Sequence, residues 1–138
     1  MTQEQHEYLG NHQWAVLATG RKDGSPQISQ IAYHWNGEDF AVSIKSYTAK
    51  WKNALRQPRV AMLIHDDRRQ LVVYGTAECI DKDPVRAELT VRVYKAFFDN
   101  PDFKVTDDLI NTLDEHRRTV FRIKPDKVLI EGFEKVDE

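Results

Sequence analysis

Basic side chains crowd into one short stretch of a chain whose overall net charge is −2. They are Lys45, Lys50, Lys52, Arg56 and Arg59. The stretch reads as the end of a strand, a helix over 48–57 and a stop at Pro58. Thr48 is of a type that caps helices, and a helix start carries backbone N–H groups without partners inside the helix. Such groups beside a lysine suit a phosphate. The stretch therefore predicts a site for a small phosphorylated anion, and a solvated surface helix is the alternative.

Fewer signals for chemistry come from the rest of the chain. Gln70 begins the apolar run QLVVYG, and its amide can both donate to and accept from the edge of a heterocyclic ring, unless it is an ordinary surface residue. Gly75 in the same run indicates a bulge with close backbone approach, or a plain bend. The histidines lack the spacing of a metal motif such as H-E-x-x-H, so we predict no metal site. Cys79, the only cysteine, is expected to be a small core residue, and no catalytic residue stands out.

The tryptophans and a late group of aromatic residues lie far apart in the sequence. We expect Trp14 to pack in the core, and Trp51, beside Lys50, to cover a ligand or a subunit interface. Tyr94, Phe97 and Phe98 fit a helix face that packs on the main body of the protein or on a second subunit. We expect His34 to be a surface or strand-end residue, and a position facing a site is the alternative.

Composition narrows the class of protein. The chain has 138 residues, of which 41% are hydrophobic and 30% charged, which is ordinary for a single globular domain spanning 1–138. The charge balance gives no case for a nucleic-acid partner. One cysteine excludes an internal disulfide and favours a reducing compartment. The polar segment 2–11 is no signal peptide, and no apolar run approaches the ~20 residues of a membrane span. We therefore expect a cytoplasmic protein with no membrane partner.

The pattern of apolar residues and turns predicts mainly strands, with helices in four places. Val85, Leu89, Val93 and Phe97 recur every four residues, which indicates an amphipathic helix. Hairpin-linked strands with alternating faces favour a small barrel, mainly β with inserted α, and exclude a parallel doubly wound sheet. The predicted strands are 14–19, 27–35, 40–44, 60–65, 70–80, 119–123 and 127–133, the last two separated by Pro125, with an Asn36-Gly37 hairpin between the second and third. The predicted helices are 2–11, 48–57, 84–98 and 106–115.

Four segments of the chain carry a resemblance to known proteins: WAVLATGRKDGSPQIS, FAVSIKSYTAKWKNALRQPRVAMLI, QLVVYGTAE and RTVFRIKPDKVLIEGF. In these segments the chain resembles the pyridoxamine 5′-phosphate oxidase-like split β-barrel superfamily, and in particular its branch of coenzyme F-420 (deazaflavin)-dependent reductases. The resemblance implies a six- to seven-stranded split β-barrel, FMN-binding-like, with short helices. The chain departs from the family pattern at Ala49, where flavin-using relatives usually carry arginine. No tryptophan follows Trp51, so true pyridoxamine phosphate oxidase activity is not expected.

The same resemblance implies a cofactor site and an activity. Reduced coenzyme F-420 would transfer a hydride to a small conjugated substrate in a homodimer with its cofactor sites at the interface. The alternatives are an FMN-binding flavin reductase or oxidase, a non-enzymatic cofactor-binding dimer and, more remotely, a haem-handling protein. Carried over by position, Ile31 and Ala32 pass beside the ring, Ser43, Ile44 and Lys45 contact the cofactor from the third strand, Lys50 and Asn53 lie at the phosphate, and Gln70 lies near the ring.

Overall fold

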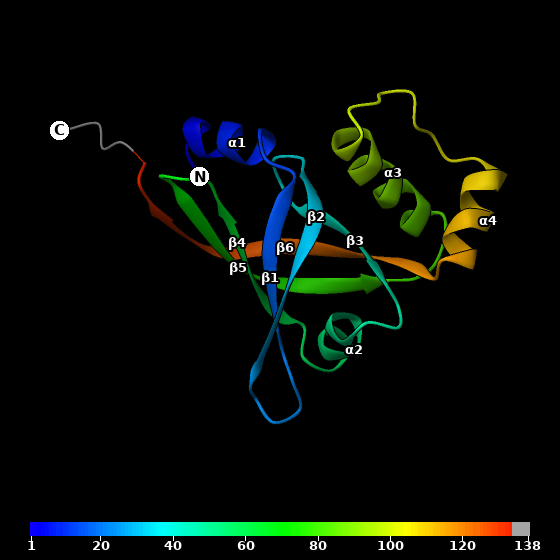
Figure 1. Ribbon diagram of the computed structural model, residues 1–138, viewed down its shortest axis with the longest axis horizontal. Helices are drawn as coiled ribbons and strands as arrows, with labels where there is room; N and C mark the ends of the chain where they lie inside the picture. The colour runs from blue at the N-terminus through cyan, green and yellow to red at the C-terminus, as the bar shows by residue number, and fades with distance from the viewer. Residues whose placement is uncertain (134–138) are drawn as a thin grey trace.

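Six antiparallel strands form a closed barrel in the order β1–β2–β3–β6–β5–β4 in the computed structural model, which describes residues 1–133 (Figure 1). Every pairing between neighbouring strands is antiparallel, so the predicted mainly β barrel is confirmed. The strands are β1 (Trp14–Gly20), β2 (Pro26–Trp35), β3 (Phe40–Lys45), β4 (Arg59–His65), β5 (Gln70–Ile80) and β6 (Arg118–Glu131).

The barrel interior is filled because apolar residues alternate along the strands and point inward together. Two short helices close the barrel from opposite sides: α1 (Gln3–Gly10) and α2 (Ala49–Arg56) (Figure 1). Tyr8 of α1 is buried and donates to the backbone oxygen of Arg69 at 3.0 Å. Trp51 of α2 is buried and stacks on Phe121 with ring centroids 5.7 Å apart. Trp51 therefore belongs to the core, and the expectation that it covers a ligand or an interface is wrong.

The last two predicted strands, 119–123 and 127–133, form one continuous strand instead. β6 runs from Arg118 to Glu131 and pairs with β5 over nearly its whole length. Pro125 does not break β6, because the register shifts between Tyr74 and Gly75 and Gly75 lies opposite the proline. A Cβ on Gly75 would lie 2.5 Å from the backbone oxygen of Lys124. The bulge with close backbone approach is therefore the correct interpretation of Gly75.

Two further helices pack outside the barrel: α3 (Val85–Phe97) and α4 (Asp107–Glu115) (Figure 1). Leu89 and Val93 of α3 bury a second apolar cluster against Ala41 of β3 and Val120 of β6. The ranges predicted for α3 and α4 are confirmed to within a residue or two at each end. No helix within residues 1–133 is both long enough and apolar enough to cross a membrane.

Two arginines on α3 anchor this pair of helices. The buried Arg86 pairs with Asp83 at 2.8 Å and with Asp114 of α4 at 2.7 Å, and it also donates to the backbone oxygen of Arg118. Arg92 pairs with Asp39 in the β2–β3 turn at 3.0 Å and donates to Nδ1 of His34 at 3.0 Å. His34 therefore fastens α3 to the barrel.

Candidate functional site

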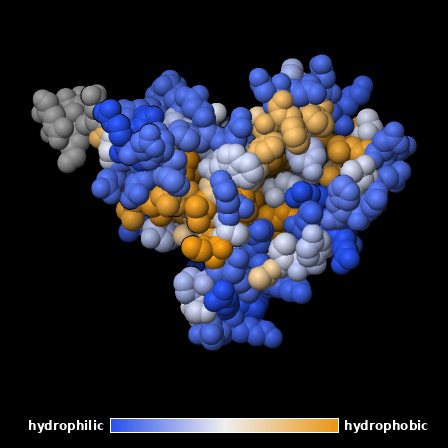
Figure 2. All heavy atoms as spheres, in the orientation of Figure 1, coloured by the Kyte–Doolittle hydropathy of each residue, from blue (hydrophilic) through white to orange (hydrophobic). Residues whose placement is uncertain are grey.

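A cavity of about 530 Å³ lies between the outer face of β2 and β3 and the helices α3 and α4. This volume is within the range of small-molecule sites. Figure 2 shows hydrophobic side chains over α3 and between that helix and the barrel. Its lining residues are Trp14, Gln30, Ile31, Ala32, Ser43, Ile44, Lys45, Thr48, Lys50, Val93, Tyr94, Phe97, Phe98, Phe103, Thr112, His116 and Arg118.

Three cations from three different elements meet in this cavity, and we call them the cationic end. They are Lys45 of β3, Lys50 of α2 and Arg118 of β6, and no carboxylate is among the residues that line the cavity. Lys45 and Arg118 lie directly opposite each other where β3 pairs with β6. The Lys50 ammonium donates to the hydroxyl of Ser29 at 3.2 Å. Because these charges have no anionic partner within the cavity, the cationic end suits an anionic group of a ligand.

Burial makes Lys50 unusual among the lysines. Its partial burial lowers the pKa of the ammonium below the ordinary value of 10.5, and the neighbouring Arg118 lowers this pKa further. A ligand phosphate would supply the missing negative charge and favour the protonated form again. The low pKa is therefore the electrostatic sign of a cation held without its counter-charge.

The start of α2 faces the same end of the cavity. Thr48 lies at the cap position but its hydroxyl donates to the backbone oxygen of Lys45 at 2.7 Å and accepts no hydrogen bond from the helix. Capping by the Thr48 side chain, the sequence-based expectation, is therefore wrong. The consequence is that the first N–H groups of α2 carry no side-chain cap, which leaves them for an anion.

The floor of the cavity is built by β2 and β3 and includes predicted cofactor contacts. Ile31, Ala32, Ser43 and Ile44, for which the resemblance implies contact with a cofactor, all line it. The Ser43 hydroxyl oxygen is buried and has no hydrogen-bond partner among the residues that the structure describes. A buried hydroxyl without a partner costs free energy unless something else bonds to it. The Ser43 hydroxyl is therefore a polar group of the cavity floor that the protein itself leaves unpaired among the described residues.

Aromatic side chains cover the opposite wall, which we call the aromatic wall. It consists of Trp14, Tyr94, Phe97, Phe98 and Phe103. Trp14 is 48% exposed and packs its ring against the edge of Phe97, with centroids 5.0 Å apart, so its predicted place in the core is wrong. Periodicity had marked Phe97 as a residue of the apolar helix face, but nothing in the sequence near Trp14 or Phe103 links them to α3.

Two of the predicted site residues lie outside the cavity. Asn53 is buried in α2, where its amide donates to the Thr19 hydroxyl at 3.2 Å and its oxygen accepts from Arg56. Gln70 lies at the start of β5 and donates to Glu131 at 3.1 Å. Neither lines the cavity, so within one chain the structure brings together Ile31, Ala32, Ser43, Ile44, Lys45 and Lys50 but not Asn53 or Gln70.

Sequence reasoning missed Arg118 and His116 as lining residues. Both are far from Lys50 along the chain and reach the cavity only because β6 pairs with β3. That pairing joins strands which are not neighbours in the sequence, and no local pattern announces it. Within residues 1–133, no group of three or more His, Cys, Asp or Glu side chains is placed to hold a metal ion.

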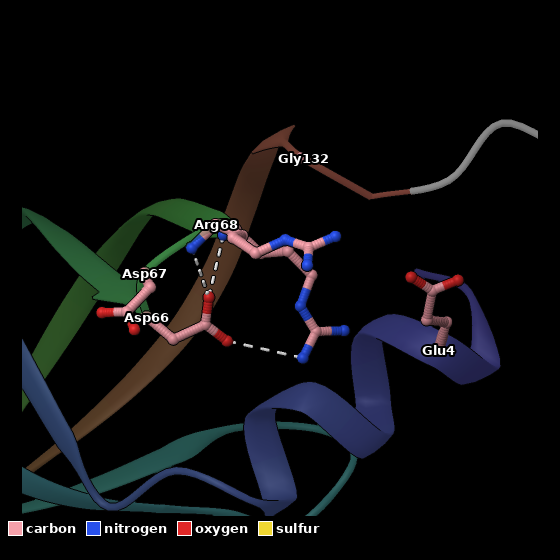
Figure 3. A pocket seen from close by; sticks show the side chains of 6 residues that line it. Glu4, Asp66, Asp67, Arg68 and Gly132 are labelled. Atoms are coloured by element: carbon pink, nitrogen blue, oxygen red, sulfur yellow. Dashed lines mark hydrogen bonds and ion pairs between the residues drawn. The ribbon is translucent and has the colours of Figure 1, made fainter.

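A second cavity, which we call the polar cleft, has a volume of about 620 Å³ (Figure 3). It is lined by Glu4, Asp66, Asp67, Arg68, Arg69 and Gly132. Figure 3 shows the Asp66 carboxylate turned toward the Arg68–Arg69 turn, where it accepts from both backbone N–H groups, at 3.0 and 2.8 Å. These bonds hold the pKa of Asp66 below its ordinary value. Arg69 lies over the rings of Tyr8 and Phe133. The side chains of Asp66 and Arg69 therefore hold this turn in place.

Comparisons with known proteins agree on one fold. A family model described as pyridoxamine 5′-phosphate oxidase matches residues 1–131. Among solved structures, the chain is similar to the conserved hypothetical protein Rv2991 from Mycobacterium tuberculosis, with 21% identity and a TM-score of 0.79 over 96% of this chain and 85% of that one. It is similar to an F420 reductase, with 25% identity and a TM-score of 0.68 over 90% and 94%. It also resembles the heme storage protein HutZ from Vibrio cholerae, with 20% identity and a TM-score of 0.75 over 94% of each chain.

Proposed function

The chain belongs to the pyridoxamine 5′-phosphate oxidase family, and from that premise we propose that it is an oxidoreductase which uses reduced coenzyme F-420 to transfer a hydride to a small conjugated organic substrate. The family as a whole supports a flavin-type cofactor and a redox activity. The similarity to an F420 reductase over most of both chains supports the choice of a deazaflavin.

The observation that carries the proposal is the cationic end of the cavity. Lys45, Lys50 and Arg118 line it together without any carboxylate. Beside them lies the uncapped start of α2. This donor set fits the phosphate of a flavin-type cofactor.

The chain's own residues would bind and orient, while the cofactor carries the chemistry. When bound, reduced coenzyme F-420 supplies a hydride, that is two electrons and a proton, to an electron-poor carbon and leaves oxidised. The substrate takes a second proton from solvent or a side chain and leaves reduced. Lys45, Lys50 and Arg118 would hold the charged tail, and β2 and β3 would fix the ring plane. The helices α3 and α4 would exclude water on the outer side.

A homodimer is part of the proposal, and the outer face of the barrel supports it. Leu63, Val72 and Leu129 are neighbours on adjacent strands, and Tyr74 follows Val72 on the same outward side. Figure 2 shows hydrophobic side chains gathered over the β4–β6 region, at the left of that view. Gln70 precedes Val72 on the same face, so a second copy that packs here would bring its Gln70 to the interface between the two copies.

The decisive test is a titration of the purified protein with coenzyme F-420 and with FMN. We expect F-420 to bind more tightly, and Lys50→Ala to weaken that binding at least tenfold, about 1.4 kcal/mol. Lys52→Ala is the matched control, because Lys52 is an exposed lysine of the same helix that does not line the cavity. Equal dissociation constants for Lys50→Ala and the unaltered protein would refute the phosphate assignment.

FMN is the second candidate, because the same cationic end fits the phosphate of any phosphorylated flavin. A protein that purifies with a yellow, FMN-type spectrum would favour an FMN-dependent reductase or oxidase. Colourless protein that binds F-420 but reduces no conjugated substrate would favour a non-enzymatic cofactor-binding dimer. Absorbance spectra of the purified protein, before and after addition of each cofactor, separate these outcomes.

A further inference from the structure

The rings of the aromatic wall form a connected chain across one side of the cavity. Trp14 meets Phe97 edge to face, and Phe97 meets Phe98 in the same way, both with centroids 5.0 Å apart. Phe98 and Tyr94 each contact Phe103 in turn, at 5.7 and 5.8 Å. These rings come from β1, α3 and the segment that follows α3, so the tertiary fold assembles them at one place.

This wall differs from the aromatic residues of the barrel core in its exposure. Phe40 and Phe121 are fully buried inside the barrel, whereas Phe98 is 56% exposed. Trp14 is about half exposed, and Tyr94, Phe97 and Phe103 are only partly buried. Contiguous exposed apolar surface in a soluble protein marks a binding site more often than chance would. Here the surface lines a cavity of small-molecule size, so the occupant it fits is a small planar molecule.

The aromatic wall and the cationic end lie at different points along β2. Lys50 bonds to Ser29, while Trp14 pairs with Ala32 three residues further along the strand. A strand rises ~3.3 Å per residue, so the two positions are roughly 10 Å apart. A ligand whose phosphate lies at the cationic end therefore extends along β2 toward the aromatic wall, and a second molecule can meet it there.

The charges around the cavity restrict what that second molecule is. A cationic compound would be repelled by Lys45, Lys50 and Arg118 and would find no carboxylate in the cavity lining. An anionic compound would be drawn to those same cations and would compete with the cofactor's phosphate. An uncharged compound has neither problem, and its flat face can pack on aromatic rings.

We propose that the aromatic wall is the substrate subsite of this protein, that it takes an uncharged, planar, conjugated ring compound, and that Phe98 and Phe103 determine this preference. The proposal rests on the proposed function, because it assigns the cationic end to the cofactor. It places the substrate-determining residues on α3 and the segment after it rather than on the barrel.

The test uses the full chain, saturated with oxidised coenzyme F-420, and two matched probes. They are 9-fluorenone, a neutral planar conjugated ketone, and 9-fluorenone-2-carboxylate, its anionic analogue. Calorimetry measures each dissociation constant for the unaltered protein and for Phe98→Ala, Phe98→Leu and Phe103→Ala. Leu55→Ala is the control, because Leu55 is an exposed apolar residue that does not line the cavity. Circular dichroism melting checks that each variant is folded.

We expect neutral 9-fluorenone to bind at least tenfold more weakly to Phe98→Ala and Phe103→Ala. Phe98→Leu, which keeps apolar volume but loses the ring, should lie between, and Leu55→Ala should match the unaltered protein. The affinity for F-420 itself should change less than twofold. The carboxylate probe should bind more weakly than the neutral one while the cofactor is present, and equal binding of the two would overturn the charge argument.

Other outcomes separate this proposal from the proposed function. If Phe98→Ala weakens F-420 and leaves 9-fluorenone unchanged, the wall holds the cofactor ring; the subsite is then refuted and the proposed function stands. If neither F-420 nor FMN binds the unaltered protein, the proposed function fails. The same fluorenone titrations without cofactor then test whether the aromatic wall binds a planar compound. Loss of fluorenone affinity in both alanine variants supports binding at the wall, and unchanged affinity refutes it.

Discussion

The site cavity and the polar cleft are of similar size but differ in what their charges do. In the polar cleft, Asp66 is bonded to the backbone of its own turn and pairs with Arg69, so its charge stabilises the fold. In the site cavity, Lys45, Lys50 and Arg118 meet without any carboxylate among the lining residues. The two cavities therefore differ in the sign of their charges, because carboxylates and arginines line the polar cleft together whereas only cations are found among the charged residues that line the site cavity.

The strongest way to break this contrast is to remove the free charges of the site cavity. We expect the double variant Lys50→Ala/Arg118→Ala to bind coenzyme F-420 about 100-fold more weakly, about 2.8 kcal/mol, because two of the three cations are lost. Arg68→Ala in the polar cleft is the comparison variant and should bind F-420 normally. Calorimetric titration measures both, and equal losses in the two variants would contradict the assignment of the site.

Variants of Asn53 distinguish a residue that binds the cofactor from one that only stabilises the fold. We expect Asn53→Ala to lower the free energy of unfolding by about 1–2 kcal/mol, because its buried hydrogen bond to Thr19 is lost. Thr19→Val removes the same bond from the other side and should have a similar effect in urea unfolding. If Asn53 also holds the phosphate, as the resemblance implies, only Asn53→Ala will weaken F-420 binding. A cofactor affinity that is equal in the two variants would restrict Asn53 to a structural role.

The lowered pKa of Lys50 predicts that the affinity for coenzyme F-420 depends on pH through the site cavity and not through the polar cleft. Because burial and Arg118 lower this pKa below 10.5, Lys50 loses its proton at a lower pH than an ordinary lysine. Affinity for F-420 should therefore fall several-fold as the pH rises toward 10.5. Lys50→Arg should keep its affinity over that range, since arginine stays protonated. Titrations at a series of pH values measure this, and parallel curves for both proteins would contradict the assignment.

Asp66 gives the smallest expected effect and concerns stability alone. Its pKa is lowered in the folded protein, first of all by the N–H group of Arg68. The ionised carboxylate therefore stabilises the fold above pH 3.8, and this contribution is lost as the pH falls through the folded pKa. Asp66→Asn should melt at a lower temperature than the unaltered protein at pH 7, and the gap should close well below pH 3.8. Its affinity for F-420 should stay unchanged.

The sequence predicted the strands and helices well because their signals are local. The apolar run QLVVYG at the start of 70–80, the four-residue spacing from Val85 to Phe97 and the Asn36-Gly37 turn each depend on neighbouring residues. In the structure, the Asn36 side chain accepts from the backbone N–H groups of Glu38 and Asp39 and so holds that turn. Pro125 misled the prediction because its effect depends on Gly75, a residue on another strand.

The site was only partly predictable, and the reason is again distance along the chain. The stretch from Ser43 to Lys50 is continuous, so its basic residues could be recognised together. Arg118 joins them through the pairing of β3 with β6, and Trp14 joins α3 through tertiary packing. The role expected for Asn53 came from the resemblance, and that of Gln70 came also from its amide at the start of a strand; both remain predictions.

The closed circle of six strands has a consequence for how two copies can associate. The circle is not sealed along its whole length, because β2 pairs with β3 only from Tyr33 to Trp35, while residues 26–32 pair with β1 alone. Addition of a strand from another chain, a usual route from a β protein to a fibril, is therefore confined to such short segments. Association through the rest of the barrel must be made by side chains, so a charged substitution among them would oppose it.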